Sequence, residues 1–130
     1  MDIVSALFIE SFDMRQVAGP ATRVDLVGIM FSMPAPTAPP VTITPHLIVL
    51  IRSRPDDAPS GILEVVFRDE AGDQVARNVS PFTVEPGKFT YRLVRGELEY
   101  KELGTIEAHC RLLPEGQTTI VPLTLLAPLR

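Results

Sequence analysis

The chain has 130 residues, of which 45% are hydrophobic and 22% charged, so it is long enough for one ordinary domain and short for two. Its thirteen prolines exclude a helical bundle, and its single cysteine excludes a disulfide-stapled mini-protein and a zinc ribbon. A net charge of −4 gives no clustered basic surface for nucleic acid or for an anionic membrane. We therefore expect one β-domain that spans residues 1–130, with neither nucleic acid nor a membrane as its partner.

The N-terminal run Ile3–Ile9 is apolar, but Asp2 precedes it where a signal peptide would carry basic residues. We therefore expect a cytoplasmic protein whose one thiol stays reduced. Ile3–Glu10 and Thr22–Met33 flank a turn that contains Gly and Pro, and this order predicts a first pair of strands. Gly28 lies inside the second strand, where a glycine is typical of a β-bulge.

An uncharged run extends from Leu26 to Ile51 and is long enough to raise the question of a membrane span. Five prolines fall inside it and would break any helix there. The run therefore predicts two extended segments, the second over Val41–Arg52, joined by a proline-rich connector over Pro34–Pro40.

Two later segments alternate between apolar and polar residues with a period of two, which is typical of half-buried strands. Leu63–Arg68 is followed by the turn Asp69–Asp73, with Gly72 at a position of positive φ, and then by a return strand that reaches Val79. Phe89–Leu93 follows a Pro-Gly turn and predicts one more strand.

The clearest alternation lies in Thr105–Leu113, where Cys110 shares the apolar face and is expected to be buried. A short turn with Pro and Gly then leads to Thr118–Leu126, so these two segments predict the last hairpin. Pro122 places its strand at an edge or a bulge. Arg95–Leu103 is the only helical candidate, and it is short and highly charged.

Seven or eight short strands separated by turns are expected from these signals. In a chain near the size of an immunoglobulin-type domain, this pattern favours an all-β fold over a mixed one. We therefore predict a two-sheet antiparallel β-sandwich of immunoglobulin-like type rather than a barrel.

Four segments follow one another along the chain: an opening ALFIESFDM, an apolar HLIVLI, the hairpin LEVVFRDEAGDQV and a closing GTIEAHCRLL. In this layout the chain resembles a family of small, uncharacterised bacterial β-sandwich proteins, over nearly its whole length. The resemblance implies a β-sandwich fold. It implies no activity and no functional residues, because the family has none assigned.

No group of residues predicts an enzyme or a metal centre. His46 and His109 are the available bases, and neither lies in a catalytic motif. His109 and its neighbour Cys110 point to opposite faces of one strand and cannot share a proton. The chain has no CxxC or HExxH spacing for zinc. Two acidic groups, interpreted as a solvated turn and a solvated edge, are Asp69, Glu70 and Asp73, and Glu97, Glu99 and Glu102.

These observations predict no catalytic residue, no metal and no cofactor. The positive feature is that two strands are apolar on both faces for half their length. The outward residues of these apolar halves are Val27, Ile29, Phe31, Ile48 and Leu50. Either they meet another protein, or the N-terminal strand or the proline-rich connector covers them. The pattern alone does not separate these two cases.

We expect a non-enzymatic protein-interaction or assembly module that binds through these five residues. Its partner is either another protein or a second copy of the chain, in which case a symmetric dimer is the commonest arrangement. The alternative is a sandwich that binds a small ligand or a carbohydrate in the loops around Pro34–Pro40 and Arg54–Ser60. Those loops carry no aromatic side chain to stack on a sugar, so we expect the interaction module.

Overall fold

The computed structural model describes residues 1–15, 17, 19, 21, 23–114 and 116–129. These residues form eleven β-strands and no helix, which confirms the predicted all-β class. No helix that could span a membrane is therefore present among them. Three of the strands, β3, β4 and β9, have only three residues each. The number of strands exceeds the seven or eight that we expected, because such short strands carry too few residues to show an alternation.

The first sheet has four strands in the order β2-β1-β5-β8, and all its neighbours are antiparallel. Its first two strands are the predicted N-terminal pair, although the first continues beyond Glu10. The strands of this sheet are β1 (Asp2–Arg15), β2 (Arg23–Met30), β5 (His46–Arg52) and β8 (Phe89–Arg95).

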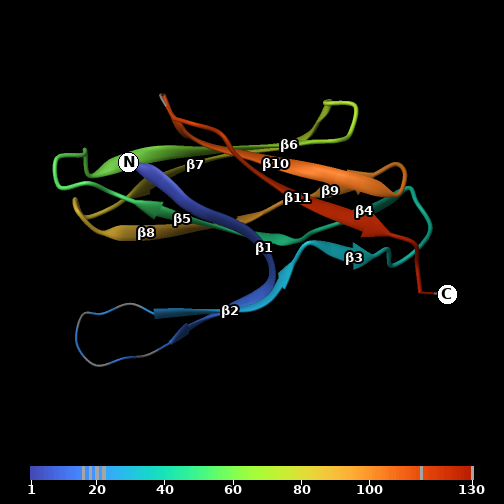
Figure 1. The fold of residues 1–130 in the computed structure, drawn as a ribbon, viewed down its shortest axis with the longest axis horizontal. Coiled ribbons are helices and arrows are strands. Elements are labelled where there is room, and N and C mark those ends of the chain that lie inside the picture. The colour runs from blue at the N-terminus through green and yellow to red at the C-terminus, as the bar shows by residue number, and fades with distance from the viewer. Residues whose placement is uncertain (16, 18, 20, 22, 115, 130) are drawn as a thin grey trace.

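The second sheet has five strands in the order β3-β11-β10-β6-β7 (Figure 1). The predicted hairpins β6–β7 and β10–β11 both form within it. One pair, β3 with β11, is parallel, so the expectation of purely antiparallel sheets is wrong for this pair. The strands of this sheet are β3 (Ser32–Pro34), β6 (Ser60–Arg68), β7 (Gln74–Thr83), β10 (Gly104–Leu113) and β11 (Thr119–Leu126).

A third, two-stranded sheet pairs β4 (Val41–Ile43) with β9 (Leu98–Tyr100). Arg95–Leu103, the only helical candidate of the sequence, therefore forms no helix, and Leu98 and Tyr100 are buried on one side of a strand. The predicted strand Val41–Arg52 is divided into β4 and β5, which belong to different sheets. Pro45 lies at the division and has no backbone N–H to donate to a ladder.

The main hydrophobic core is supplied by alternate residues of both larger sheets. Along β10 the apolar side chains are buried while Glu107 and Arg111 on the other side are exposed, as a period of two predicts. Cys110 is fully buried among them, which confirms the prediction for the thiol. The central strands contribute Leu47, Val49 and Ile51 from β5, Leu63, Val65 and Phe67 from β6, and Ile106, Ala108, Cys110 and Leu112 from β10.

Two glycines allow bends in the backbone that other residues rarely adopt. Gly72 closes the β6–β7 turn with a φ of 87°, as predicted. Gly28 has a φ of 65°, and a Cβ built on it would lie 2.5 Å from Cδ of Glu10 on the neighbouring strand. The register is the same on both sides of it, since Ile9 faces Ile29 and Ser11 faces Val27. Gly28 is therefore a bend and not the predicted bulge.

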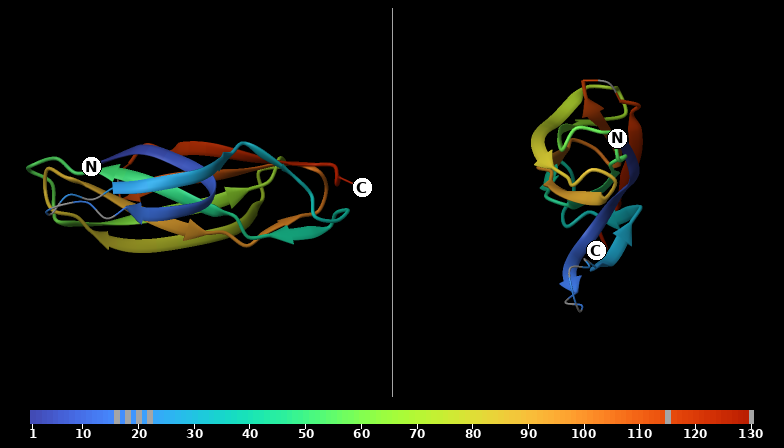
Figure 2. Two further views of the ribbon diagram at one scale, coloured as in Figure 1. Left: turned by 90° about the horizontal axis from the view of Figure 1, so that it is seen from below. Right: turned by 90° about the vertical axis from the view of Figure 1, so that its left-hand side faces the viewer.

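The four-stranded sheet folds back on itself, so that the distal part of the β1–β2 hairpin lies over the outer face of β8. In Figure 1 its distal part lies below β8, and Figure 2 shows the far half of β1 running back toward the end of the molecule where the chain starts. The ring of Phe12 in this part of β1 meets Tyr91 of β8 edge to face, with 6.2 Å between the ring centroids. The hydroxyl of Tyr91 also donates to the sulfur of Met14 at 3.1 Å. The hairpin therefore packs on the outer face of its own sheet.

A polar contact joins the edge strands of the two larger sheets on the side where β7 and β8 meet. The guanidinium of Arg92 in β8 donates from Nε and Nη2 to Oγ of Ser80 in β7, at 3.0 and 2.7 Å. Both residues lie in rows that face the interior, opposite Val49 and Leu63. This side of the molecule is consequently linked by hydrogen bonds between side chains rather than by a backbone ladder.

Candidate functional site

A row of large apolar side chains follows the outer edge of the four-stranded sheet. Val27 and Ile29 of β2 are each about half exposed, and Phe31, just after the strand, is 74% exposed. The carbonyl of Phe31 accepts a hydrogen bond from the backbone N–H of Thr124 in β11 at 3.1 Å. The backbone that carries this row is therefore hydrogen-bonded to the rest of the protein, since Ile29 pairs with β1 and Phe31 with β11.

Ile48 and Leu50 lie elsewhere, on the outer face of β5. Ile48 has 0% exposed surface and Leu50 is partly buried. Both point away from the main core, because Leu47, Val49 and Ile51 are the residues of β5 that enter it. Tyr91 lies directly opposite Leu50 on β8, and it is the residue that contacts the β1–β2 hairpin.

The five residues expected to form one surface therefore lie in two environments. Val27, Ile29 and Phe31 are solvent-exposed, whereas Ile48 is covered and Leu50 is half-covered. The packing of Phe12 and Met14 on Tyr91 shows that the N-terminal strand lies on this face of the sheet, one of the two cases that the sequence left open. The exposed row, which we call the β2 row, consists of Val27, Ile29 and Phe31.

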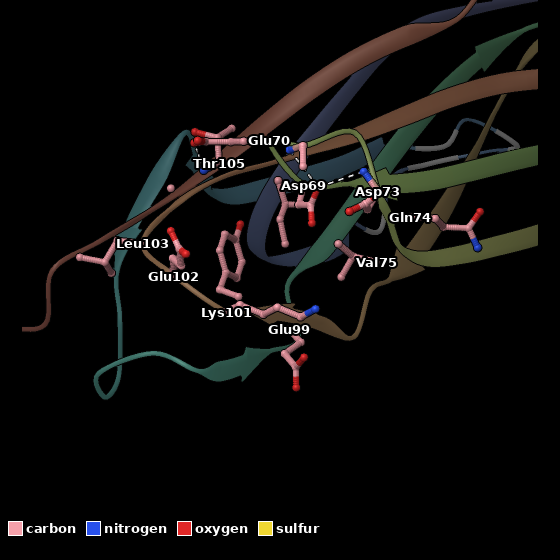
Figure 3. Close-up of a pocket in the computed structure, with 14 residues that line it drawn as sticks. Asp69, Glu70, Asp73, Gln74, Val75, Glu99, Lys101, Glu102, Leu103 and Thr105 are labelled. Carbon is pink, nitrogen blue, oxygen red and sulfur yellow. Dashed lines mark hydrogen bonds between the residues drawn. The ribbon is translucent and has the colours of Figure 1, made fainter.

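A cavity of about 480 Å³ opens at the end of the molecule where the β6–β7 turn approaches the chain between β9 and β10. Figure 3 shows Asp69, Glu70 and Asp73 on one side of it, and Glu99, Lys101 and Glu102 on the other. All of the first acidic group of the sequence and, except for Glu97, the second thus line one cavity, and no spacing in the sequence signals that they meet. The loops Pro34–Pro40 and Arg54–Ser60, considered for a ligand, do not line it.

The nearest carboxylates of this cavity hold the protein's own backbone. Oδ1 of Asp69 accepts hydrogen bonds from the N–H groups of Ala71 and Asp73, both at 3.0 Å. Oε1 of Glu70 accepts one from the N–H of Thr105 at 2.8 Å, which ties the turn to the start of β10. Within the described ranges, no group of three or more potential metal ligands is placed to hold an ion. The geometry accounts for these acids as supports of the turn.

The cavity also presents no free aromatic platform. Tyr100 lines it, but its ring is buried and its hydroxyl donates to the carbonyl of Leu123 at 2.6 Å. Burial raises the pKa of this hydroxyl far above its ordinary value of 10.0, so it stays protonated as a donor. Tyr100 thus joins β9 to β11 and is already satisfied without a ligand.

A charged group occupies the middle of the outer face of the five-stranded sheet. Arg77 of β7 donates from Nε and Nη2 to Oε2 of Glu64, at 3.1 and 2.7 Å, and Arg111 of β10 donates from Nε to Oε1 at 2.9 Å. The Arg77 and Arg111 guanidinium groups hold the pKa of the Glu64 carboxyl below its ordinary value. Arg111 lies 47 residues after Glu64 on a strand that only the fold places beside β6, so the sequence does not reveal this group. We call it the arginine pair with Glu64.

The remaining reactive side chains do not form a catalytic arrangement in the described residues. Burial raises the pKa of the Cys110 thiol to about 12, which leaves it protonated and a poor nucleophile. His109 is partly exposed on the opposite face of β10, with Nε2 3.3 Å from Oε1 of Glu107. The expected separation of Cys110 and His109 on opposite faces is therefore confirmed.

Comparison with known proteins adds no relative. The sequence matches no protein-family model, and no curated protein matches it.

Proposed function

We propose that this protein is a non-enzymatic assembly module that pairs with a second copy of itself along the edge of β2. The observation that carries the proposal is the exposed β2 row on a strand that has only one neighbour. In the described part of the chain, β2 pairs with β1 alone, so the outer side of its backbone has no partner strand. An open edge with exposed apolar side chains is a template for pairing with another strand.

The edge of β2 carries little that would prevent such pairing. Its eight residues include no proline and no lysine, the two residue types that most often protect an exposed edge. Its partner is a second copy because two identical strands can pair antiparallel about a two-fold axis, which closes the assembly. Each contact made by one β2 row is then repeated by the other, and burial of the remaining exposed surface of these side chains favours the dimer.

The fold that supports this proposal is an immunoglobulin-like sandwich. We infer that the four- and five-stranded sheets are its two layers, since both supply the same core. In such an arrangement, pairing along β2 extends one sheet from each protomer into a continuous sheet. The resemblance to small bacterial β-sandwich proteins is consistent with this layout and stays a prediction.

Light scattering after gel filtration tests the proposal across a range of protein concentrations. We expect the wild-type mass to rise toward that of a dimer with concentration, and the Ile29→Lys variant to stay monomeric. A matched control is Ile120→Lys, because Ile120 is 49% exposed and Ile29 is 45% exposed, on different sheets. This control is expected to dimerise like the wild type. A wild type that is monomeric throughout, or equal loss of dimer in both variants, contradicts the proposal.

A small-ligand-binding function is the second candidate, and the end cavity favours it. A volume of about 480 Å³ lies in the range of small-molecule sites. Thermal melting in the presence of a panel of mono- and disaccharides tests this candidate. A rise in melting temperature that is lost when the exposed, cavity-lining Lys101 is changed to Ala supports it, and no rise with any sugar contradicts it.

A further inference from the structure

We propose that the outer face of the five-stranded sheet binds an acidic, extended segment of another protein, with a carboxylate of that segment held between Arg77 and Arg111. The proposal concerns a surface and a partner different from those of β2 pairing, so neither depends on the other.

The two arginines are held in place by Glu64 and are still exposed to solvent. Their side chains are 49% and 45% exposed, whereas the Glu64 side chain that lies between them is 11% exposed. Hydrogen bonds to Glu64 fix both guanidinium groups, which are rigid planar donors. Among the described residues, Nη1 of Arg77 and both Nη atoms of Arg111 donate no hydrogen bond to the protein. Two ordered cationic groups therefore keep N–H donors that are not used by Glu64.

The strand rows of this face carry more positive than negative charge. Arg68, Arg77 and Arg111 lie in its rows with Glu64 and Glu107, so three positive charges less two negative charges leave +1. The whole chain carries −4. The middle of this face is thus positive, while Asp69 and Glu70 lie at its end beside Arg68. A carboxylate that approaches the middle of the face is attracted to Arg77 and Arg111.

Exposed apolar side chains surround the two arginines. Val79 lies directly opposite Glu64 on β7, and Ile62 lies two residues before Glu64 on the same face of β6. Ile120 of β11 lies on this face opposite His109. All three are exposed large hydrophobic residues. Arginines surrounded by apolar side chains are the composition found at the centre of protein interfaces.

An acidic segment is the partner that fits this face best. Carboxylates pair with guanidinium groups through two parallel hydrogen bonds, which suits the free donors of Arg111. A second copy docked by the same face would bring two positive faces together, which disfavours it. A net charge of +1 on the face is also too small for the phosphate backbone of a nucleic acid, which is bound by several basic residues. An acidic segment with apolar residues between its carboxylates matches both the charge and the apolar surroundings.

Fluorescence anisotropy with a rhodamine-labelled peptide of alternating Val and Glu tests the proposal. We expect the wild type to bind this peptide and not the matching peptide of alternating Val and Gln. The variant Glu64→Gln removes the internal competitor for the arginines, and we expect binding to tighten about two- to fivefold. A structural role for Glu64 alone would change stability and leave peptide affinity unchanged.

The loss variant is the triple change Glu64→Gln, Arg77→Gln and Arg111→Gln. It leaves no uncompensated charge on the sheet and lowers the net charge by one, so it is expected to fold, as far-UV circular dichroism would verify. Binding should weaken at least about tenfold. The control is Arg23→Gln near the hairpin tip, which also lowers the net charge by one and should leave affinity unchanged.

Besides unchanged peptide affinity in Glu64→Gln, three further results overturn the proposal. The first is a wild type that does not bind the Val-Glu peptide, and the second is equal binding of the Val-Gln peptide. The third is an equal loss of affinity in the triple variant and in Arg23→Gln, which would mean that net charge alone attracts the peptide.

Discussion

Ile48 provides a direct test of whether the β1–β2 hairpin covers its own sheet. The side chain has no exposed surface, yet it lies on the face of β5 that points away from the main core. Replacing it with Ala removes buried apolar atoms and leaves a cavity, which lowers the free energy of unfolding by roughly 2–5 kcal/mol. The matched change Ile29→Ala affects a side chain that is half in water, so its cost should be about 1 kcal/mol or less.

Urea unfolding followed by far-UV circular dichroism measures both costs. With a slope of about 2 kcal/mol per molar urea, Ile48→Ala should lower the unfolding midpoint by about 1–2.5 M. Ile29→Ala should shift the midpoint only slightly, in dilute protein where self-association is absent. Midpoints that move by the same small amount in both variants would refute the burial of Ile48 beneath the hairpin.

Three further predictions follow from single contacts. Tyr100→Phe removes the hydroxyl that satisfies the carbonyl of Leu123, so urea unfolding should show a loss of roughly 1–3 kcal/mol, and unchanged stability would contradict this role. Cys110 should react with a thiol reagent only after denaturation, because the thiol is buried with a pKa of about 12, and rapid labelling of the native protein would disprove it. Hydrogen bonds from Arg77 and then from Arg111 lower the pKa of Glu64 in the folded state. The ionised carboxylate therefore stabilises the fold at pH values above its ordinary pKa of 4.5, and this stabilisation is lost as the pH falls below 4.5 toward the lowered pKa. Melting temperatures measured from neutral to acidic pH should therefore fall less steeply in Glu64→Gln than in the wild type, and parallel curves would count against it.

The sequence predicted the strands whose two faces differ. In β10 the alternation is uninterrupted over the whole strand, because one face meets the core and the other meets water. The β6–β7 turn was predicted equally well, since Gly72 is required there by its positive φ. Such features are local, and the nearest neighbours in the chain determine them.

The errors arise where distant parts of the chain decide the outcome. β9 has only three residues, and Leu98 and Tyr100 are buried because β4 and the core lie beside them, not because of a local period. Ile48 has the same sequence signal as Ile29, and only the return of the hairpin onto the outer side of the sheet separates a covered residue from an exposed one. The contacts of Glu64 with Arg77 and Arg111 likewise depend on three strands lying side by side, which no spacing records.

The parallel pairing of β3 with β11 has a consequence for the order of folding. Ser32 lies beside Thr124, so 92 residues separate two partners in one ladder. A contact of this kind closes a long loop and costs chain entropy. Native states that need many such contacts fold more slowly. During synthesis, β3 cannot find its neighbour until the last of the eleven strands has left the ribosome. Until then the segment around the exposed Phe31 lacks its native neighbour and is available for pairing with other nascent chains.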